Sequence, residues 1–426
     1  MDEPIITSLL DLDFYKLTMQ QLALIGHPDI RVKFGFVCRA KDVNLPGVIP
    51  VRVLREQLAH LRDLHFLPQD IKYLRSSKYI PPGLFCEEYL AHLRWLRLPE
   101  ISVEVVGDQF QIEAEGLWSE VTLVETLALS IVNELYNYYQ LRARDLPPGA
   151  PAKAGRERLN EKIQALQASS LRDSLQPQCI VEFGTRRRFA GWWQAYVADQ
   201  LARRSPELFA GTSNVRLAQR FDLRPIGTFA HELDMVYSRL YGNRNLDIRV
   251  SHSYMLQDWW ALYREPLSIA LTDTYGTNAF FKDFNSVQAQ DWRGVRHDSG
   301  SWLSFGEKVI AFYEQQGIDP QTKTVVWSDG LTPDVVLAIN QTFGQRIRCV
   351  YGWGTNLTND FGAGARENFG VRPLSIVMKV IESNGQPTVK LSDNPAKAIG
   401  PQAEIERFQR IFGYNPADYE RVTCVY

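Results

Sequence analysis

The sequence Gly-Thr-Phe-Ala-His-Glu at Gly227–Glu232 lies between a short apolar-tending run, Arg224–Ile226, and a predicted helix, Leu233–Tyr241. A short run that ends abruptly in small and polar residues before a helix is typical of the carboxyl end of a β-strand in a βα unit. The pattern therefore predicts that His231 lies at the tip of a strand.

The same pattern occurs six more times in the middle of the chain, and each predicted strand ends in Gly together with polar or charged residues. In a parallel barrel all such ends lie on one rim, whereas a doubly wound sheet gathers only the ends near its switch point. So many polar strand ends favour an α/β barrel. The six runs are Val181–Arg186, Phe209–Asn214, Ile269–Gly276, Val295–Gly300, Val325–Gly330 and Cys349–Asn356.

The two ends of the chain have a different pattern. Ile101–Glu115 alternates between apolar and polar residues around Gly107-Asp108, which predicts a β-hairpin. Leu374–Ile381 is a further strand-like run. We expect the terminal segments to form one α+β domain beside the barrel. The predicted division is 1–120 for the first part of that domain, 121–360 for the barrel, and 361–426 for the returning part.

Composition excludes several classes of protein. A net charge of −2 over 426 residues argues against a nucleic-acid partner or binding to an anionic membrane. The five cysteines have no paired spacing, which argues against zinc or a disulfide framework and favours a reducing compartment. The first residues do not resemble a signal peptide, and no apolar run approaches the length of a membrane span. We expect a cytoplasmic protein.

The polar strand ends offer complementary chemistry. Arginines such as Arg186 and Arg296 match phosphate or carboxylate oxygens, and glycines let backbone N–H groups approach a phosphate. Acids such as Asp273 and Asp298 suit Mg²⁺ or ribose hydroxyls. A phosphorylated sugar with magnesium would satisfy all three. The seven histidines lack ligand spacing, so no metal site with direct His or Cys ligation is expected.

Several of these residues also have simpler interpretations. Glu182 could pair with the neighbouring arginines, and Arg187 and Arg188 could be surface residues at a helix start. Asp329 could be a helix N-cap. His231 could cap or pack, and Tyr15 could be an aromatic residue at the edge of the core.

Eight motifs, spread in order over residues 11 to 360, resemble those of nicotinate phosphoribosyltransferases, and Lys390–Asp393 also fits. The motifs are Asp13-Phe14-Tyr15-Lys16, Glu182–Arg187, Gly211–Val215, Gly227–Glu232, Asp273–Thr277, Arg296–Gly300, Ser328-Asp329-Gly330 and Gly352–Asn356.

The resemblance implies the first step of nicotinate salvage to NAD. Nicotinate and phosphoribosyl pyrophosphate give nicotinate mononucleotide and pyrophosphate, with Mg²⁺ and coupled ATP hydrolysis in a ligase-type reaction. It also implies an irregular TIM-like α/β barrel plus an α/β sandwich built from both chain ends. A homodimer with shared active sites is expected.

The resemblance also assigns roles to individual residues. Phe183 and Tyr15, the latter from a partner subunit, would sandwich the pyridine ring, with Arg296 beside it. Ser213 would lie near the carboxylate of nicotinate; related nicotinamide enzymes have an acid there, which would repel that group. His231 would be phosphorylated by ATP, and Asp298 would stabilise the cationic sugar. The phosphoribosyl pyrophosphate would be bound by Arg186, Asp273, Gly330, Gly352, Gly354 and Thr355.

One position departs from the family pattern. Ser301 stands where the family often has Asp after Asp-Ser-Gly. This removes a negative charge near the expected pyrophosphate site.

Three other functions remain open from the sequence. One is a nicotinamide-using relative. Another is a barrel glycosidase that uses two of Glu182, Asp273 and Asp298. The last is a non-catalytic nucleotide-binding protein. Release of pyrophosphate that depends on nicotinate would distinguish them.

Overall fold

The computed structural model describes residues 3–168 and 174–420 and contains two β-sheets. The larger sheet has six strands in the order β5-β4-β9-β8-β7-β6, and every neighbouring pair is parallel. Its strands are β4 (Ile180–Glu182), β5 (Phe209–Thr212), β6 (Ile269–Leu271), β7 (Gly294–His297), β8 (Thr324–Trp327) and β9 (Arg348–Trp353). Six of the seven predicted strands are therefore confirmed.

The strand predicted at Arg224–Ile226 is wrong in extent. Pro225 makes only an isolated parallel bridge to Thr212, at the free edge of β5. Proline has no N–H to donate to a ladder, which limits a three-residue run to this single contact. The strand order is cyclic in sequence, because the first strand β4 pairs with the last strand β9.

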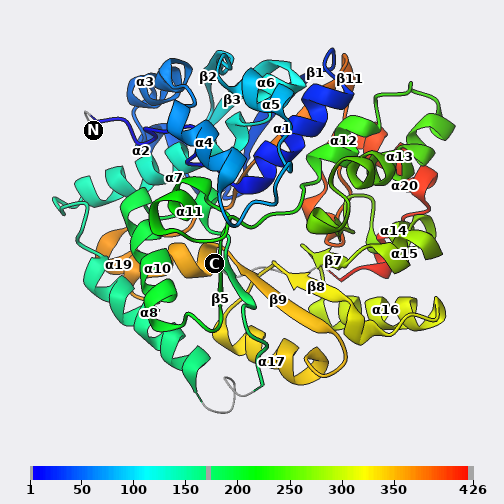
Figure 1. Cartoon of the computed structure of the whole chain (residues 1–426). Helices are drawn as coiled ribbons and strands as arrows, with labels where there is room; N and C mark the ends of the chain where they lie inside the picture. The colour runs from blue at the N-terminus through cyan, green and yellow to red at the C-terminus, as the bar shows by residue number, and fades with distance from the viewer. Residues whose placement is uncertain (1–2, 169–173, 421–426) are drawn as a thin grey trace.

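Helices connect the parallel strands, and several of them cover the outside of the sheet (Figure 1). Their apolar faces pack on strands such as β7 and β8, in which every residue is buried. Such burial on both faces is typical of parallel sheets. These helices are α8 (Ala152–Gln167), α10 (Gly191–Arg204), α11 (Val215–Phe221), α12 (Glu232–Tyr237), α13 (Asn245–Tyr263), α14 (Thr277–Asp283), α15 (Ser286–Asp291), α16 (Trp302–Gln315), α17 (Pro333–Phe343) and α18 (Thr355–Thr358).

The smaller sheet is antiparallel and draws its strands from both ends of the chain, in the order β11-β10-β1-β3-β2. The late strand β10 pairs with the early strand β1, in the part of the sheet at the top of Figure 1. Its strands are β1 (Arg31–Cys38), β2 (Ile101–Val106), β3 (Gln109–Leu117), β10 (Ile376–Ser383) and β11 (Gln386–Pro387). The predicted hairpin is β2–β3.

The helices of this part are mostly short. Among them α7 contacts α3, β10 and the turn after β4, so it lies between the two sheets. They are α1 (Phe14–Gly26), α2 (Leu45–Val48), α3 (Val51–His60), α4 (Pro68–Ser76), α5 (Glu87–Leu93), α6 (Trp118–Val121) and α7 (Val124–Arg142), followed late in the chain by α19 (Ala365–Phe369) and α20 (Gln402–Phe412).

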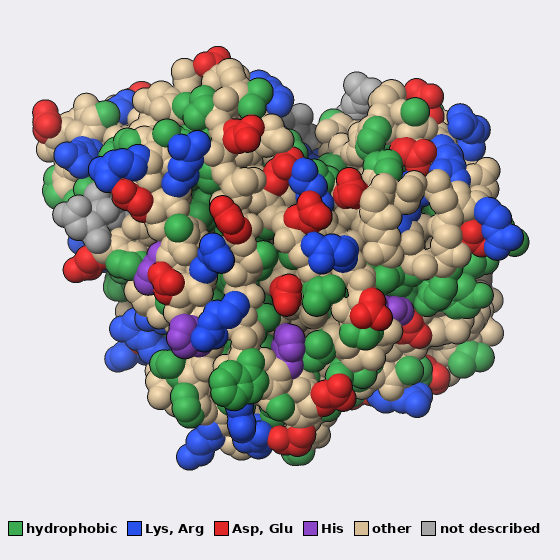
Figure 2. All heavy atoms as spheres, turned by 90° about the horizontal axis from the view of Figure 1, so that it is seen from above, with side chains coloured by type: hydrophobic (Ala, Val, Ile, Leu, Met, Phe, Trp, Pro, Cys, Tyr) green, Lys and Arg blue, Asp and Glu red, His purple; other side chains and the backbone are tan. Residues whose placement is uncertain are grey.

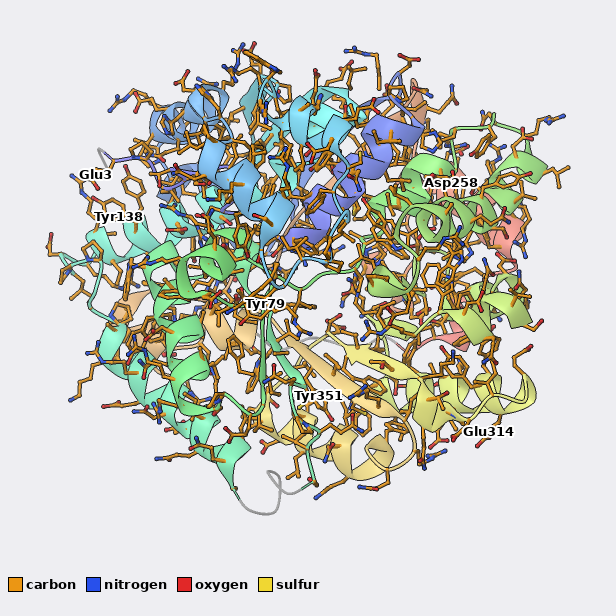
Figure 3. All side chains as sticks on the ribbon, in the orientation of Figure 1. Glu3, Tyr79, Tyr138, Asp258, Glu314 and Tyr351 are labelled. Carbon is orange, nitrogen blue, oxygen red and sulfur yellow. The ribbon has the colours of Figure 1, made fainter. Side chains whose placement is uncertain are left out.

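One continuous hydrophobic core runs through both sheets. Tyr351, labelled in Figure 3, lies on β9 in this core and is fully buried. The surface seen from above in Figure 2 carries basic and acidic side chains interspersed. Within 3–168 and 174–420, no helix has the length and apolar character needed to cross a membrane.

Candidate active site

A cavity of about 160 Å³ opens where the carboxyl ends of the parallel strands meet α1 and the returning C-terminal segment. Its lining is predominantly basic, with seven cations against three carboxylates. The cations are Arg39, Arg186, Arg187, Arg296, Lys379, Lys390 and Lys397, and the carboxylates are Asp13, Asp298 and Asp329.

Most of the residues predicted for the site line this one cavity. They are Tyr15, Phe183, Arg186, Ser213, His231, Arg296, Asp298, Gly330, Gly354 and Thr355. Asp273 and Gly352 are the two exceptions. Both lie directly behind lining residues, Asp273 behind His231 and Gly352 behind Phe183.

Two aromatic residues enter the cavity from different elements. Tyr15 lies in the first turn of α1, and Phe183 follows β4. Glycines allow both approaches: a Cβ on Gly227 would lie 2.8 Å from the backbone nitrogen of Tyr15, and one on Gly352 would lie 2.4 Å from the ring of Phe183. Gly352 therefore accommodates an aromatic ring, in a position different from the predicted phosphate contact.

Tyr15 lines the cavity of its own chain. The expectation that a partner subunit provides this ring concerns an assembly of two chains and stays a prediction. The position of Tyr15 has a local cause. Asp13 bridges to Asn214, and the N–H of Phe14 donates to the carbonyl of Ser213 at 2.7 Å, which fixes the start of α1 beside β5.

Two buried polar atoms in this part of the cavity have no hydrogen-bond partner among the described residues. They are Nε of Arg296 and the hydroxyl of Tyr15. Nη1 of Arg296 donates to the hydroxyl of Thr228 at 2.8 Å, which fixes the guanidinium. Because buried polar groups are nearly always satisfied, these two atoms indicate where a polar ligand binds.

Ser213 is closely associated with an acid from another element. Its hydroxyl donates to Asp13 at 2.6 Å, and Asp13 lies 3.6 Å from Nε of Arg186. Burial raises the pKa of the Asp13 carboxyl, and Arg186 opposes this effect. The sequence motif included Asp13, but its contact with Ser213 was not predicted.

His231 begins a buried hydrogen-bonded chain. Its Nε2 lies 2.8 Å from Asp273, whose other oxygen accepts from the hydroxyl of Ser299 at 2.5 Å. Burial and the nearby Lys390 lower the pKa of His231 to about 4, although Asp273 acts in the opposite direction. The imidazole is therefore neutral near pH 7. His231 makes no side-chain cap for α12, so the capping alternative is wrong.

Asp298 lies at the end of β7 and faces the cavity. Burial acts to raise the pKa of its carboxyl, but Arg296 and His231 outweigh that effect and lower the pKa to about 2. Oδ2 of Asp298 lies 3.6 Å from Nε2 of His231, and the hydroxyl of Ser328 donates to Oδ1 at 3.0 Å. Asp298 is thus an anion across the physiological range.

His231, Asp273 and Asp298 place potential metal-ligating atoms within 4.8 Å of one another. However, Asp273 already accepts hydrogen bonds on both oxygens, from His231 and Ser299. The carboxylate of Asp298 remains partly exposed to the cavity, with 29% of its side chain accessible. Mg²⁺ prefers oxygen ligands and commonly uses one or two carboxylates together with substrate phosphates, which fits Asp298.

Three lysines from the C-terminal return line the cavity, and none of them was among the predicted site residues. Lys379 lies on β10, and Lys390 and Lys397 follow β11. Only Lys390 carried a signal, within the Lys390–Asp393 motif. Burial lowers the pKa of Lys390 to about 8, with Asp273 opposing the shift, and its Nζ lies 3.8 Å from Asp273.

The structure also decides between simpler interpretations. Arg188 is buried and pairs with Asp11 at 2.6 Å, so it is not a surface residue, whereas Arg187 lines the cavity. Asp329 lies 2.9 Å from Lys397, and the cap of α17 is Thr332.

Among the described residues, Glu182 forms no ion pair with an arginine. It accepts hydrogen bonds from Thr212 and Gln194, and burial raises its pKa to about 7. Of the three carboxylates proposed for a glycosidase, only Asp298 lines the cavity. The geometry therefore does not support that alternative.

Comparison with known protein families agrees with this site. Residues 179–415 match the model of the nicotinate phosphoribosyltransferase family, and residues 10–133 match the model of its N-terminal domain. The chain belongs to the nicotinate phosphoribosyltransferase family. Its function is therefore in NAD salvage, as the sequence motifs predicted.

Solved structures of the family are similar over nearly the whole chain. A nicotinate phosphoribosyltransferase from Vibrio cholerae is 36% identical with a TM-score of 0.87, covering 97% of this chain and 95% of that one. One from Porphyromonas gingivalis is 30% identical with a TM-score of 0.82, covering 96% and 100%. A putative one from Saccharomyces cerevisiae is 27% identical with a TM-score of 0.81, covering 97% and 100%.

Proposed function

We propose that this cavity transfers the phosphoribosyl group of phosphoribosyl pyrophosphate to nicotinate, with release of pyrophosphate, in a reaction coupled to ATP hydrolysis. The observation that carries the proposal is the arrangement of the lining. Two aromatic rings and the unsatisfied Nε of Arg296 lie in the same cavity as an array of cations and a buried histidine. A flat anionic ring and a polyphosphate together match these groups.

In this proposal the pyridine ring lies between Tyr15 and Phe183. Nε of Arg296 would donate to the carboxylate of nicotinate, which would satisfy the buried N–H. Ser213 and Asp13 lie beside this position. With its hydroxyl already donated to Asp13, Ser213 would act mainly by keeping the local charge low.

The phosphoribosyl end would occupy the basic part of the cavity. Arg186 would bind the pyrophosphate, and Gly330, Gly354 and Thr355 would surround the 5′-phosphate. Asp298 would stabilise the positive charge that develops on the sugar as pyrophosphate leaves, because its carboxylate is ionised and faces the cavity. Asp273 would act through His231, which it orients.

Mg²⁺ would be held by Asp298 and by oxygens of the bound pyrophosphate. When bound, the ion would neutralise charge on the leaving group. The carboxylate of Asp298 is held ready for this role by the hydroxyl of Ser328, which occupies only one of its oxygens.

ATP would phosphorylate His231. With its Nε2–H donated to the ionised Asp273, Nδ1 is the nitrogen left with a lone pair for attack on the γ-phosphorus. Nδ1 would form a bond to phosphorus as the bond to the leaving ADP oxygen breaks. The new negative charge would lie near Lys390, and this cation would stabilise the phosphorylated histidine.

The proposal extends to the fold, the location and the assembly of the protein. We interpret the parallel sheet as a TIM-like barrel open between β5 and β6, and its cyclic strand order supports this. A cytoplasmic location is supported by the four described cysteines, which are free thiols. A homodimer with shared active sites is still expected.

The test measures pyrophosphate release from phosphoribosyl pyrophosphate and Mg²⁺, with nicotinate or nicotinamide, in the presence and absence of ATP. We expect release with nicotinate, stimulated by ATP, together with acid-labile phosphate on the protein. Loss of both the labelling and the stimulation in His231→Ala would support the coupling role. Full ATP stimulation in that variant would contradict it.

A further inference from the structure

Glu125 is a buried carboxylate of α7 that does not line the cavity but contacts two residues that do. Its Oε1 lies 2.8 Å from Nζ of Lys379 and 3.7 Å from Nη1 of Arg186. Lys379 comes from β10 and Arg186 from the turn after β4, so this one side chain connects the two sheets at the cavity.

A third cation fixes Glu125 from behind. Nζ of Lys16 lies 2.6 Å from Oε2 of Glu125 and 2.5 Å from Oε2 of Glu232. Lys16 and both carboxylates are almost completely buried, each with at most 1% of its side chain accessible. Glu125 therefore cannot rotate away from the cavity cations without leaving a buried charge unpaired, which is costly.

We infer that Glu125 is a positioning residue, which orients Arg186 and Lys379 so that both can bind the pyrophosphate group of the sugar substrate. The inference rests on the proposed function, because that proposal assigns Arg186 to the phosphates. It adds Lys379 as a phosphate contact and Glu125 as the group that aligns the pair.

Charge as well as position supports this role. Three other charged groups act on Lys379 besides Glu125: Arg186 and Lys16, which also pair with that carboxylate, and Lys390, which lines the same cavity. All three are cationic and act against protonation of Lys379. Burial lowers the pKa of Lys379, and Glu125 opposes that effect. Removing the charge of Glu125 would therefore lower the pKa of Lys379 further.

Glu125→Gln is the test, because it preserves shape while removing the charge. Glu232→Gln is the matched control: Glu232 pairs with the same Lys16 and accepts hydrogen bonds from Trp118 and Thr122, but among the described residues it forms no ion pair with Arg186 or Lys379. We expect Glu125→Gln to weaken calorimetric binding of phosphoribosyl pyrophosphate with Mg²⁺ by about tenfold or more, since hydrogen bonds to charged groups are strong.

A second readout separates positioning from general damage to the fold. As pH rises, the affinity for phosphoribosyl pyrophosphate should begin to fall at a lower pH in Glu125→Gln than in the wild type. The reason is that Lys379 loses its proton at a lower pH in the variant. In Glu232→Gln the pH dependence should remain that of the wild type. Adding Lys379→Gln to Glu125→Gln should cost less than the two single effects combined.

Binding by Glu125→Gln equal to that of the wild type, or equal losses and unchanged pH profiles in both variants, would overturn the inference. If Glu125→Gln does not fold, Glu125→Asp serves: its shorter carboxylate keeps the charge but should still weaken binding. These outcomes can be distinguished from failure of the proposed function. In that case the wild-type protein would neither bind phosphoribosyl pyrophosphate nor release pyrophosphate.

Discussion

His231 differs from an exposed histidine because its environment keeps it neutral. Burial lowers the pKa of this imidazole to about 4, below the ordinary histidine value of about 6.5. A neutral imidazole has the lone pair that phosphoryl transfer requires. We predict that the initial rate of ATP-dependent labelling of the protein is constant from about pH 6 to 8 and declines only toward the lowered pKa. Acid-labile phosphate formed from labelled ATP measures this rate.

A midpoint near the ordinary histidine value would contradict this account, because it would mean that His231 titrates as a solvated group. Asp273→Asn is an informative companion. It removes the anion that favours protonation, and it also releases the ring from its fixed orientation. Labelling should therefore slow at every pH.

Gly352 provides a second prediction for a single residue. A Cβ there would lie 2.4 Å from the ring of Phe183 and must displace it. We expect Gly352→Ala to raise the KM for nicotinate by about tenfold, while the KM for phosphoribosyl pyrophosphate changes little. Steady-state kinetics with each substrate varied would measure this. A larger effect on phosphoribosyl pyrophosphate would instead support the phosphate contact predicted from sequence.

At the scale of elements, Arg188 joins three segments. Its guanidinium donates to both oxygens of Asp11 before α1, at 2.6 and 2.9 Å, and to Glu134 on α7 at 2.7 Å. Arg188→Met would leave two buried carboxylates without their partner. We predict a loss of about 3–5 kcal/mol in the free energy of unfolding, measured by chemical denaturation.

The matched control is Arg203→Met on α10. Arg203 pairs with Asp199 four residues earlier, with 74% of its side chain exposed, and such surface pairs contribute about 1 kcal/mol or less. Similar losses in both variants would show that the buried Arg188 network does not join these segments.

The contrast between local and long-range contacts explains which features of the elements could be predicted from the sequence. Buried strands such as β8 are predictable because a short apolar run ends in Ser-Asp-Gly. Arg188 was misjudged because it stands in a run of three arginines, and its partner Asp11 is 177 residues away. Lys379 reaches the cavity through pairing of β10 with β1, which no local pattern indicates.

At the scale of the whole molecule, stability should depend on pH through buried histidines. His297 is buried, its Nε2 has no hydrogen-bond partner in the described part of the chain, and burial lowers its pKa. The unfolded chain thus binds protons that the folded one does not. The stabilisation is fully present above the unfolded pKa of about 6.5 and is lost as pH falls toward the folded value.

We predict that the free energy of unfolding decreases between pH 6.5 and 5, by at most about 1.4 kcal/mol per pH unit for each such histidine. His297→Gln should reduce this slope, and replacement of the exposed His65 by Gln should not. Denaturation series across this pH range would measure the slope. An unchanged slope in His297→Gln would mean that other groups cause the dependence.

The position of β10 between β11 and β1 has a consequence for synthesis on the ribosome. A nascent chain emerges from its amino end, so β1 and its sheet neighbour β3 leave the exit tunnel long before Ile376–Ser383 is translated. Until then one edge of β1 remains open to unintended pairing. We expect chaperones to protect that edge while the parallel sheet forms, and the amino-terminal layer to be completed only near the end of translation.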